Sequence, residues 1–318
     1  MSDIKKRPFV NEDYEALVDI WNQIYPEYPS SVQEVKYDDL HPDPRSKQGR
    51  FMAELDEETV GTGEYFQLSA WFHPQKFHID ISVKPEARRK GVGSAIYNAL
   101  LEDLAPFQPI SLRCRVREDI TEGIDFLKHR GFEENFSDWE SRLEVTTFDF
   151  GPYSGLIESL ESRGFLIKTY KELEGDPDRD SKLHNLWMEI NQDIPFPDPP
   201  TPVPFETFQD WMKYPALLPD GFFVMVYEGE YVGLSNLWKS QDDPYLNTGL
   251  TGVKRGFREI GIATALKLKT VEYAQKFGFK YIKTWNASYN QAMLSINERL
   301  DFKKQVAWIS YLKKLGED

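Results

Sequence analysis

Three cations and two glycines stand together in the segment "ARRKGVGS", residues 87–94. Just before it, "FHIDISV" (residues 77–83) alternates apolar and polar residues, which predicts a β-strand that Pro85 ends. From Ser94 onward the apolar residues follow helical spacing. The start of a helix presents unpaired amides and a partial positive charge, and glycines let a ligand approach the backbone. With three cations added, the segment predicts a pyrophosphate site.

A single copy of this pattern could equally be a solvated basic turn, but the chain repeats it. The segment "FREIGIAT", residues 257–264, follows a matching strand and opens a matching helix. Five pairs of positions lie 170 residues apart: Val83 and Val253, Arg88 and Arg258, Gly91 and Gly261, Gly93 and Ala263, Phe132 and Phe302. Neither copy fits a Walker loop, and the first lacks the third glycine of a dinucleotide fingerprint. The repeat therefore favours a duplicated ligand cradle.

The composition narrows the classes of partner. The chain has 318 residues, a net charge of -14 and one cysteine, Cys114, which we interpret as a small buried residue. The acidic balance argues against nucleic acid or an anionic membrane as partner, and it is compatible with an amine substrate. No apolar run reaches the roughly 18 residues of a membrane span, and the histidines show no metal-ligand spacing. We expect a cytoplasmic protein without a metal.

The elements that must position the two loops follow the same order in both halves. Each half begins with an amphipathic helix, around residues 14–21 and 183–190, and continues with a β-hairpin. A strand, the Arg/Gly loop, a helix, another strand, a short helix and a closing strand follow. This order predicts an α/β fold with a mixed sheet flanked by helices. The joint is expected near Thr147 to Gly155, which gives domains 1–150 and 151–318.

Both halves resemble the Gcn5-related N-acetyltransferases, the GNAT superfamily, in tandem form, as in mycothiol synthase-like acetyltransferases. The resemblance rests on the strand, the R-x-x-G-x-G/A loop and the helix, followed by a helix that ends in Gly-Phe or its variant. It implies two GNAT folds, each a mostly antiparallel mixed sheet with a central βαβ unit that binds coenzyme A. It also implies transfer of an acetyl group from acetyl-CoA to a primary amine of a small molecule or peptide, by direct attack in a ternary complex.

The resemblance also implies which residues meet the cofactor. Strand residues would pair with the pantetheine arm, and loop residues would hold the pyrophosphate. In the first copy these are Ile81, Ser82, Val83, Arg88, Arg89, Lys90, Gly91, Val92, Gly93 and Ser94. In the second they are Thr251, Gly252, Val253, Arg258, Glu259, Gly261, Ile262, Ala263 and Thr264, with Asn290 and Asn297. The amide of Val83 or Val253 would polarise the thioester carbonyl.

The sequence departs from the family pattern at the proton donor. The tyrosine that often lies four residues before Gly-Phe is replaced by Leu127 in the first copy and by Asn297 in the second. Since Asn290 is kept only in the second copy, we expect the second copy to be catalytic. Candidate bases are Glu64 and Asp80 in the first copy, and Asp242 or Asp243 in the second.

Several alternatives stay open at this stage. The protein could be a non-catalytic acyl-CoA-binding sensor, because both tyrosines are missing, or it could transfer another acyl group. The acceptor amine cannot be read from the sequence, and either a monomer or a homodimer is compatible with it. Six prolines between Pro195 and Pro204 form either an acceptor wall or a rigid connector.

Overall fold

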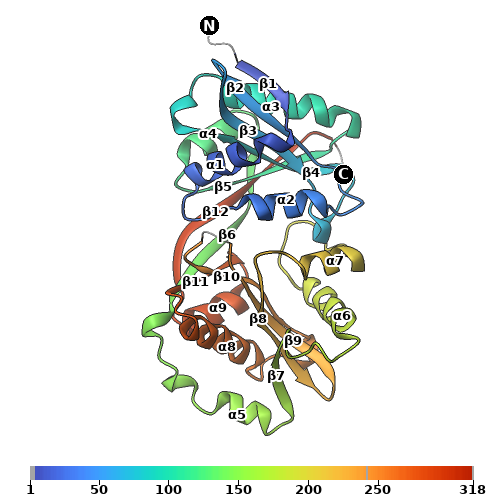
Figure 1. Ribbon diagram of the computed structural model, residues 1–318, viewed down its shortest axis with the longest axis vertical. Helices are drawn as coiled ribbons and strands as arrows, with labels where there is room; N and C mark the ends of the chain where they lie inside the picture. Colours follow the sequence, from blue (N-terminus) through green and yellow to red (C-terminus); the bar gives the residue numbers. More distant parts are fainter. Residues whose placement is uncertain (1–3, 241–242, 317–318) are drawn as a thin grey trace.

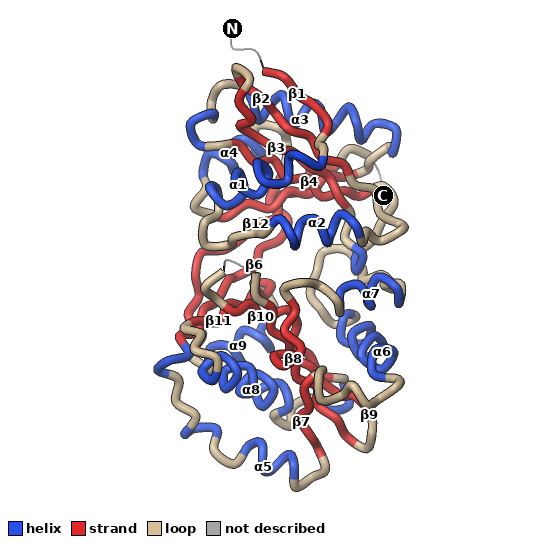
Figure 2. Tube along the Cα trace, viewed as in Figure 1, coloured by secondary structure: helices blue, strands red, loops and turns tan. Residues whose placement is uncertain are grey.

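The computed structural model describes residues 4–240 and 243–316. Figure 1 shows an elongated molecule with one half above the other and the N-terminal half at the top. Figure 2 shows that strands run through the middle of both halves, with helices on the outside. None of the helices in the described ranges has the length and apolar character that a membrane crossing requires.

Within the described residues, twelve strands form one continuous sheet. Their order across it is β1-β2-β3-β4-β5-β12-β6-β11-β10-β9-β8-β7. The strands of the first half are β1 (Ile4–Pro8), β2 (Gly49–Leu55), β3 (Glu58–Phe66), β4 (Lys76–Val83), β5 (Ser111–Arg117) and β6 (Glu133–Glu144). Those of the second half are β7 (Phe165–Thr169), β8 (Leu217–Tyr227), β9 (Glu230–Trp238), β10 (Leu246–Val253), β11 (Tyr281–Ala287) and β12 (Lys303–Lys314).

The closing strand of each half is exchanged with the other half. β12, from the end of the chain, pairs antiparallel with β5, and β6 pairs antiparallel with β11. The two exchanged strands also pair with each other, and they cross the middle of the molecule in Figure 1. Each half-sheet is therefore completed by a strand from the other half of the sequence.

Nine helices in the described residues cover the two faces of this sheet. They are α1 (Tyr14–Ile24), α2 (Val32–Leu40), α3 (Val92–Leu104), α4 (Thr121–Lys128), α5 (Leu156–Glu161), α6 (Arg179–Asn191), α7 (Phe205–Trp211), α8 (Ile262–Lys276) and α9 (Gln291–Arg299). Neighbouring residues of one strand face opposite sides, so Met52 joins the core under α1 and α2 while Ala53 joins the core under α3. The expected mixed α/β fold, mostly antiparallel and flanked by helices, is confirmed.

Two short parallel pairs prepare the sites. β4 pairs with β5 only over residues 76–78 and 111–113, and β10 pairs with β11 only over residues 246–247 and 282–283. Beyond these residues the parallel strands have no further paired positions, so each pair separates toward the carboxyl end of its first strand. The Arg/Gly loops follow at those ends, as ligand sites commonly do in α/β sheets.

Candidate functional site

The two Arg/Gly loops have the same backbone. In the first, Arg88 Nε donates to the carbonyl oxygen of Val83 over 3.2 Å, and in the second Arg258 Nε donates to Val253 over 3.0 Å. Gly91 precedes α3 with φ +91°, and Gly261 precedes α8 with φ +95°. This left-handed conformation favours glycine, so the duplicated glycines start the two helices in the same way.

The same bonding pattern orients the last strand residues. Lys84 N donates to Val60 O over 2.9 Å, and Val83 lies opposite Gly61 in the register of β3 and β4. Because hydrogen-bonded and non-bonded pairs alternate along an antiparallel ladder, the Val83 amide points away from β3. It therefore faces the gap between β4 and β5. Val253 is oriented alike, since Lys254 N donates to Val232 O.

A cleft of about 560 Å³ opens in the first copy between β4, β5, α3 and α4. It contains most of the cofactor residues expected in the first copy. The lining residues among them are Ile81, Ser82, Val83, Arg88, Arg89, Gly91, Gly93 and Ser94. Lys90 is exposed beside this loop and Val92 is buried in the core under α3. The first amides of α3 have no acceptor within the helix, so they can bind an anion here.

A fourth cation, which sequence reasoning missed, joins this cleft. Arg130 follows α4, and its guanidinium lies 3.5 Å from the ring centroid of Phe126 and donates to Ser94 Oγ over 2.6 Å. The signal that could have found it is its place directly before Gly131, where the second copy has Leu300. Arg130 therefore adds a cation to the cleft, whose lining also contains the carboxylates of Asp125 and of Glu122, which lies 3.6 Å from Arg88.

The arginines of the second loop are already paired. Arg255 and Arg258 both bind the carboxylate of Asp193, and this contact lowers the pKa of Asp193 to about 2. Glu259 adopts φ +65°, like Arg89 with φ +60° in the first copy, so a carboxylate replaces a guanidinium at a matched position. At Gly261 an added Cβ would lie 2.8 Å from Leu156 of α5. The second loop is thus less positive and more crowded than the first.

Two carboxylates face each other on the α1 side of the first copy. Glu64 of β3 lies opposite Asp80 of β4, and side chains of opposed residues share one face of a sheet. Low solvent access raises the pKa of Glu64 to about 7, although Arg50 lies 2.9 Å away and opposes this shift. Burial also raises the pKa of Asp80, which accepts a hydrogen bond from Ser82 Oγ and lines the cleft.

The deep end of the cleft adds groups that the sequence did not single out. Tyr25, at the end of α1, lines it together with Cys114 and Arg115 of β5. Burial raises the pKa of both the Tyr25 phenol and the Cys114 thiol, so both stay protonated at neutral pH. Leu127, at the position of the missing tyrosine, lines the same cleft. Tyr25, at the end of α1, therefore contributes a phenol to the cleft.

The asparagines of the second copy have partners within the protein. Asn290 Oδ1 accepts from the Met293 amide over 3.3 Å and caps α9. Asn297 is buried and donates to Asn286 Oδ1 over 2.6 Å, while its own Oδ1 has no hydrogen-bond partner among the described residues. Among the cofactor residues expected in the second copy, Ile262 is buried in the core. Partial exposure is seen at Thr251, Gly252, Ala263 and Thr264.

Asp243, a candidate base of the second copy, makes its contacts within the protein. Asp243 is buried, accepts from Asn247 and the Tyr245 amide, and lies 3.3 Å from Lys283 Nζ. Asp242 lies outside the described residues. At the positions that match Asp80 and Glu64, the second copy has Leu250 and Asn236.

The proline-rich run attaches the second half to the first. Thr201 N donates to Ala70 O over 2.8 Å, and Asp198 pairs with Arg113 over 2.7 Å and with Lys76 over 3.1 Å. Phe196 packs against Trp71 with ring centroids 4.4 Å apart. The proline-rich run thus connects the second half to the first by a hydrogen bond, ion pairs and ring packing.

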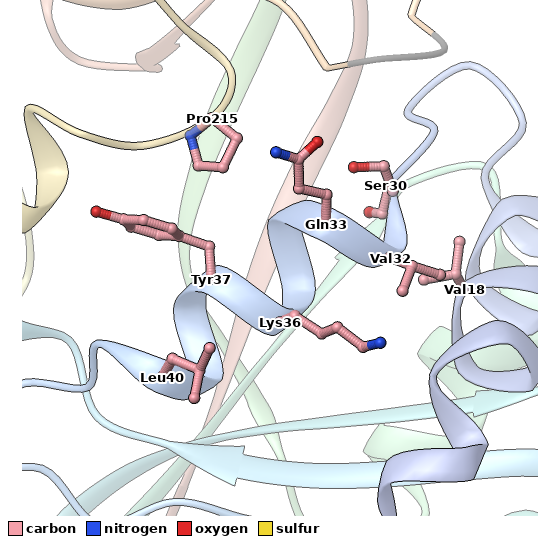
Figure 3. A pocket seen from close by; sticks show the side chains of 9 residues that line it. Val18, Ser30, Val32, Gln33, Lys36, Tyr37, Leu40 and Pro215 are labelled. Atoms are coloured by element: carbon pink, nitrogen blue, oxygen red, sulfur yellow. The ribbon is translucent and has the colours of Figure 1, made fainter.

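Another hollow, of about 730 Å³, lies between α2 and Pro215 (Figure 3). It is lined mostly by apolar and neutral side chains, and Lys36 is the charged residue of its lining. It offers no carboxylate or imidazole that could act as a base, so the cleft of the first copy is the better candidate for chemistry.

Comparison with known proteins agrees with this geometry. A family model described as the acetyltransferase (GNAT) family matches residues 14–132 and 182–302. In sequence, no curated protein matches this chain.

Several solved structures share the fold. A tandem GNAT protein from the clavulanic acid biosynthesis pathway has a TM-score of 0.73 and 17% identity, over 99% of this chain and 100% of that one. A GCN5-related N-acetyltransferase from Sphaerobacter thermophilus has a TM-score of 0.70 and 15% identity, over 99% and 96% of the two chains. A glucosamine N-acetyltransferase region of a fungal GH3 β-N-acetylglucosaminidase has a TM-score of 0.71 and 13% identity, over 98% of this chain and 38% of that one.

Proposed function

The chain belongs to the acetyltransferase (GNAT) family, and we propose that it is an acetyl-CoA-dependent N-acetyltransferase whose first copy carries the reaction. The observation that carries this proposal is the cleft between β4 and β5, in which the Arg/Gly loop and Arg130 line one cavity together with Asp80 and Tyr25. The proposal reverses the expectation from the sequence, which favoured the second copy because of Asn290.

The residues of the first cleft suit coenzyme A. The unpaired amides of α3, with Arg88, Arg89, Lys90 and Arg130, would bind the phosphates. Gly93 lets Phe126 pack closely against the start of α3, since an added Cβ would lie 3.2 Å from the Phe126 ring. The exposed backbone edge of Ile81–Val83 would pair with the pantetheine amides, as one strand pairs with another.

The chemistry divides among three side chains and one amide. Acetyl-CoA supplies the thioester, and the acceptor supplies a neutral amine. Asp80, with Glu64 beside it, would take the proton of the attacking amine, because burial raises the pKa of both carboxyls toward neutrality. The Val83 amide would stabilise the developing oxyanion, and the Tyr25 phenol would protonate the departing thiolate. Tyr25 would thus replace the tyrosine that Leu127 displaces.

Release of free thiol from acetyl-CoA, measured with a panel of primary amines, tests this function. We expect Gly91→Glu to abolish turnover and acetyl-CoA binding by calorimetry, because it places a carboxylate in the cradle. Gly91→Ala separates backbone strain from charge, and Gly261→Glu is the matched control in the second copy. Loss of turnover in Gly261→Glu alone would assign the reaction to the second copy instead.

If no amine of the panel causes thiol release and acetyl-CoA still binds tightly, the non-catalytic sensor is favoured instead. Faster turnover of another acyl-CoA would correct the acyl group. The division into residues 1–150 and 151–318, a cytoplasmic location, and a monomer or homodimer remain part of the proposal. Although β6 and β12 are exchanged in space, the proposed boundary between the two domains keeps its place in the sequence.

A further inference from the structure

The segment that joins α1 to α2, residues 25–31, begins at the lining of the first cleft. Tyr25 lines the cleft directly. At the other end of the segment, Asn22 donates to Ser30 O over 3.1 Å and accepts from the Ser30 amide over 2.8 Å. These bonds close the loop on itself, and they leave its middle, Glu27 and Tyr28, to be held by other parts of the chain.

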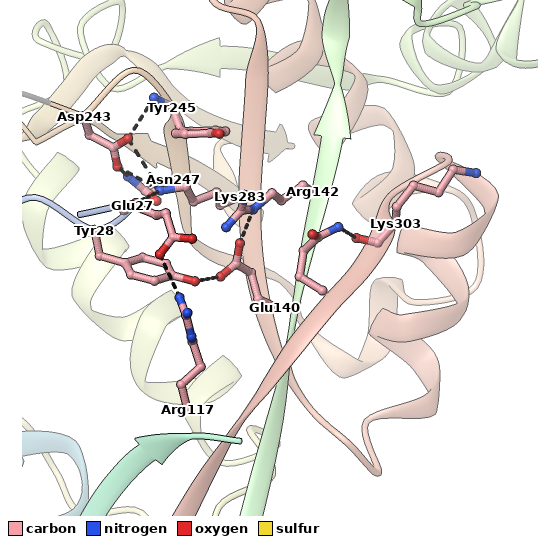
Figure 4. Close-up of polar contacts among 11 residues, drawn as sticks. Glu27, Tyr28, Arg117, Glu140, Arg142, Asp243, Tyr245, Asn247, Lys283 and Lys303 are labelled. Atoms are coloured by element: carbon pink, nitrogen blue, oxygen red, sulfur yellow. Dashed lines mark hydrogen bonds and ion pairs between the residues drawn. The ribbon is translucent and has the colours of Figure 1, made fainter. Parts of the chain in front are cut away.

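A buried lysine of the second half holds the backbone of this segment. Lys283 of β11 has no exposed surface, and its Nζ donates to the carbonyl oxygen of Glu27. The same Nζ lies 3.3 Å from Asp243 Oδ2 and 4.1 Å from the ring centroid of Tyr245 (Figure 4). A buried ammonium is costly unless its donors are used, so the Glu27 carbonyl is part of what stabilises Lys283 in this position.

A buried glutamate holds the side chain of the segment. The Tyr28 hydroxyl donates to one carboxylate oxygen of Glu140, and Arg142 Nε donates to the other (Figure 4). Glu140 has no exposed surface and lies on β6, beside β11 of the second half. The Tyr28 ring also packs near Trp308 of β12, with centroids 5.5 Å apart.

The anchored Tyr28 is connected to Tyr25 through the ring of Trp308. Trp308 packs against Tyr25 with ring centroids 5.0 Å apart, and the Arg115 guanidinium lies 4.9 Å from the Trp308 ring. Arg117 of β5 also contacts the segment, because its guanidinium lies 2.7 Å from the Glu27 carboxylate. Loss of the contacts from Lys283 and Glu140 should therefore loosen residues 25–31 and leave the Arg/Gly loop of the first copy intact.

We propose that Lys283 and Glu140 are positioning residues for the first-copy site: Lys283 of the second half and Glu140 of the exchanged strand β6 hold residues 25–31, so that Tyr25 keeps its place in the lining of the cleft. The proposal rests on the proposed function for its kinetic part. Its structural part, the anchoring of the segment by Lys283 and Glu140, can be measured without any turnover.

The test combines hydrogen exchange with kinetics on the full-length protein. In Lys283→Met we expect amide exchange within residues 25–31 to accelerate at least tenfold, while exchange in α3 stays unchanged. The KM for the acceptor amine should rise about tenfold, and the KM for acetyl-CoA should change less than twofold. Lys283→Arg keeps a donor and should recover part of both effects. Lys280→Met, an exposed lysine before the same strand, is the matched control.

Tyr28→Phe keeps the test decisive if Lys283→Met does not fold, because it removes one hydroxyl and little volume. Unchanged exchange in residues 25–31 of both variants, or of Tyr28→Phe alone if the other is unfolded, would overturn the proposal. Equal rises in the KM for acetyl-CoA and for the acceptor would also overturn it, because a general loss of structure predicts them. Faster exchange in a protein that acetylates no amine would refute the proposed function and retain the anchoring.

Discussion

The two Arg/Gly loops share a backbone conformation and differ in their charges. Both place a glycine in the left-handed region before a helix, and both tie an arginine to the last carbonyl of the preceding strand. In the first copy Arg89 and Lys90 are exposed, whereas in the second Glu259 takes one of these places and Asp193 binds Arg255 and Arg258. Two loops can therefore share a backbone conformation and differ in the charges that they present.

The same contrast extends to the groups behind the loops. The carboxylate pair of the first copy, Glu64 and Asp80, is matched by an amide and an apolar side chain in the second. Beneath the loops, Tyr97 of α3 is matched by Lys267 of α8, which is buried. We therefore expect substitutions at matched positions to have unequal effects, and the following experiments test this asymmetry in order of decreasing effect.

The largest effect is expected at Asp80. Asp80→Asn removes the carboxylate that lines the cleft, so kcat should fall by about 10² to 10⁴ while the dissociation constant of acetyl-CoA stays within twofold. Steady-state kinetics and calorimetry measure the two quantities. The matched change in the second copy, Leu250→Asn, should keep kcat within about threefold. Equal losses from both variants would contradict the asymmetry.

The pH dependence of the rate examines the same pair of carboxylates. A base must be deprotonated to act, and the pKa of Glu64 is raised to about 7. We expect kcat/KM of the native protein to rise with pH and to level off above about pH 7. In Glu64→Gln this rise should move to lower pH, because the remaining carboxyl loses a negatively charged neighbour. An unmoved profile would exclude Glu64 from the proton transfer.

The next effect concerns stability at Lys267. Burial lowers the pKa of Lys267 to about 7, and its Nζ lies 4.8 Å from the ring centroid of Phe302. Unfolded lysine stays protonated to about pH 10, so the free energy of unfolding should rise with pH between about 7 and 10. Lys267→Met should remove this rise and stabilise the protein by about 1–3 kcal/mol at pH 7.

Urea unfolding at pH 6.5, 8 and 9.5 measures the effect of Lys267→Met. Lys269→Met, on the same helix and partly exposed, is the control and should leave the pH dependence unchanged. A loss of stability in Lys267→Met at every pH would mean that the ammonium has a stabilising role in the second copy.

A smaller effect is expected at Arg130. Arg130→Leu introduces the residue type of the second copy, and the affinity for acetyl-CoA should fall about five- to tenfold, since one phosphate-facing cation is lost. The slope of affinity against salt concentration should become shallower, because fewer charges are screened. Calorimetry at two ionic strengths measures both. An exposed neighbour of the matched Leu300, Arg299→Leu, should leave the affinity unchanged.

The smallest effect is expected at Asp193. Asp193→Asn frees Arg255 and Arg258, so the second loop should gain a weak affinity for acetyl-CoA of about two- to threefold over its native level. A titration of this variant in the Gly91→Glu background isolates the second loop. If that background already binds acetyl-CoA tightly with Asp193 intact, the two cradles are equivalent and the comparison fails.

Periodicity and spacing were sufficient for the local elements. The alternation of residues 77–83 predicts a strand, and β4 spans Lys76–Val83. The offset of 170 residues predicts two matched loops, and their dihedral angles agree within a few degrees at Gly91 and Gly261. These features depend on neighbours in the chain, so a local pattern carries them.

The candidate site was only partly readable. The loop residues of the first copy were identified because the motif is contiguous, whereas Arg130 and Tyr25 lie on other elements and have no motif of their own. The resemblance to the family predicts that Asn290 and Asn297 contact the ligand. In the structure Asn290 caps a helix and Asn297 donates to Asn286. An asparagine serves caps, buried pairs and ligands with the same amide, so its type does not decide among these roles.

The sequence by itself determined a duplicated strand, loop and helix, and the family to which they belong. The tertiary structure decided how much charge and space each loop has, because Asp193, Leu156 and Arg130 approach the loops from distant segments. It also decided that β6 and β12 are exchanged, since either half-sheet offers an equivalent edge to a strand of the same pattern. Which strand edges pair and which charges neutralise one another depends on contacts between residues far apart in the sequence. A pattern of neighbouring residues does not specify these contacts.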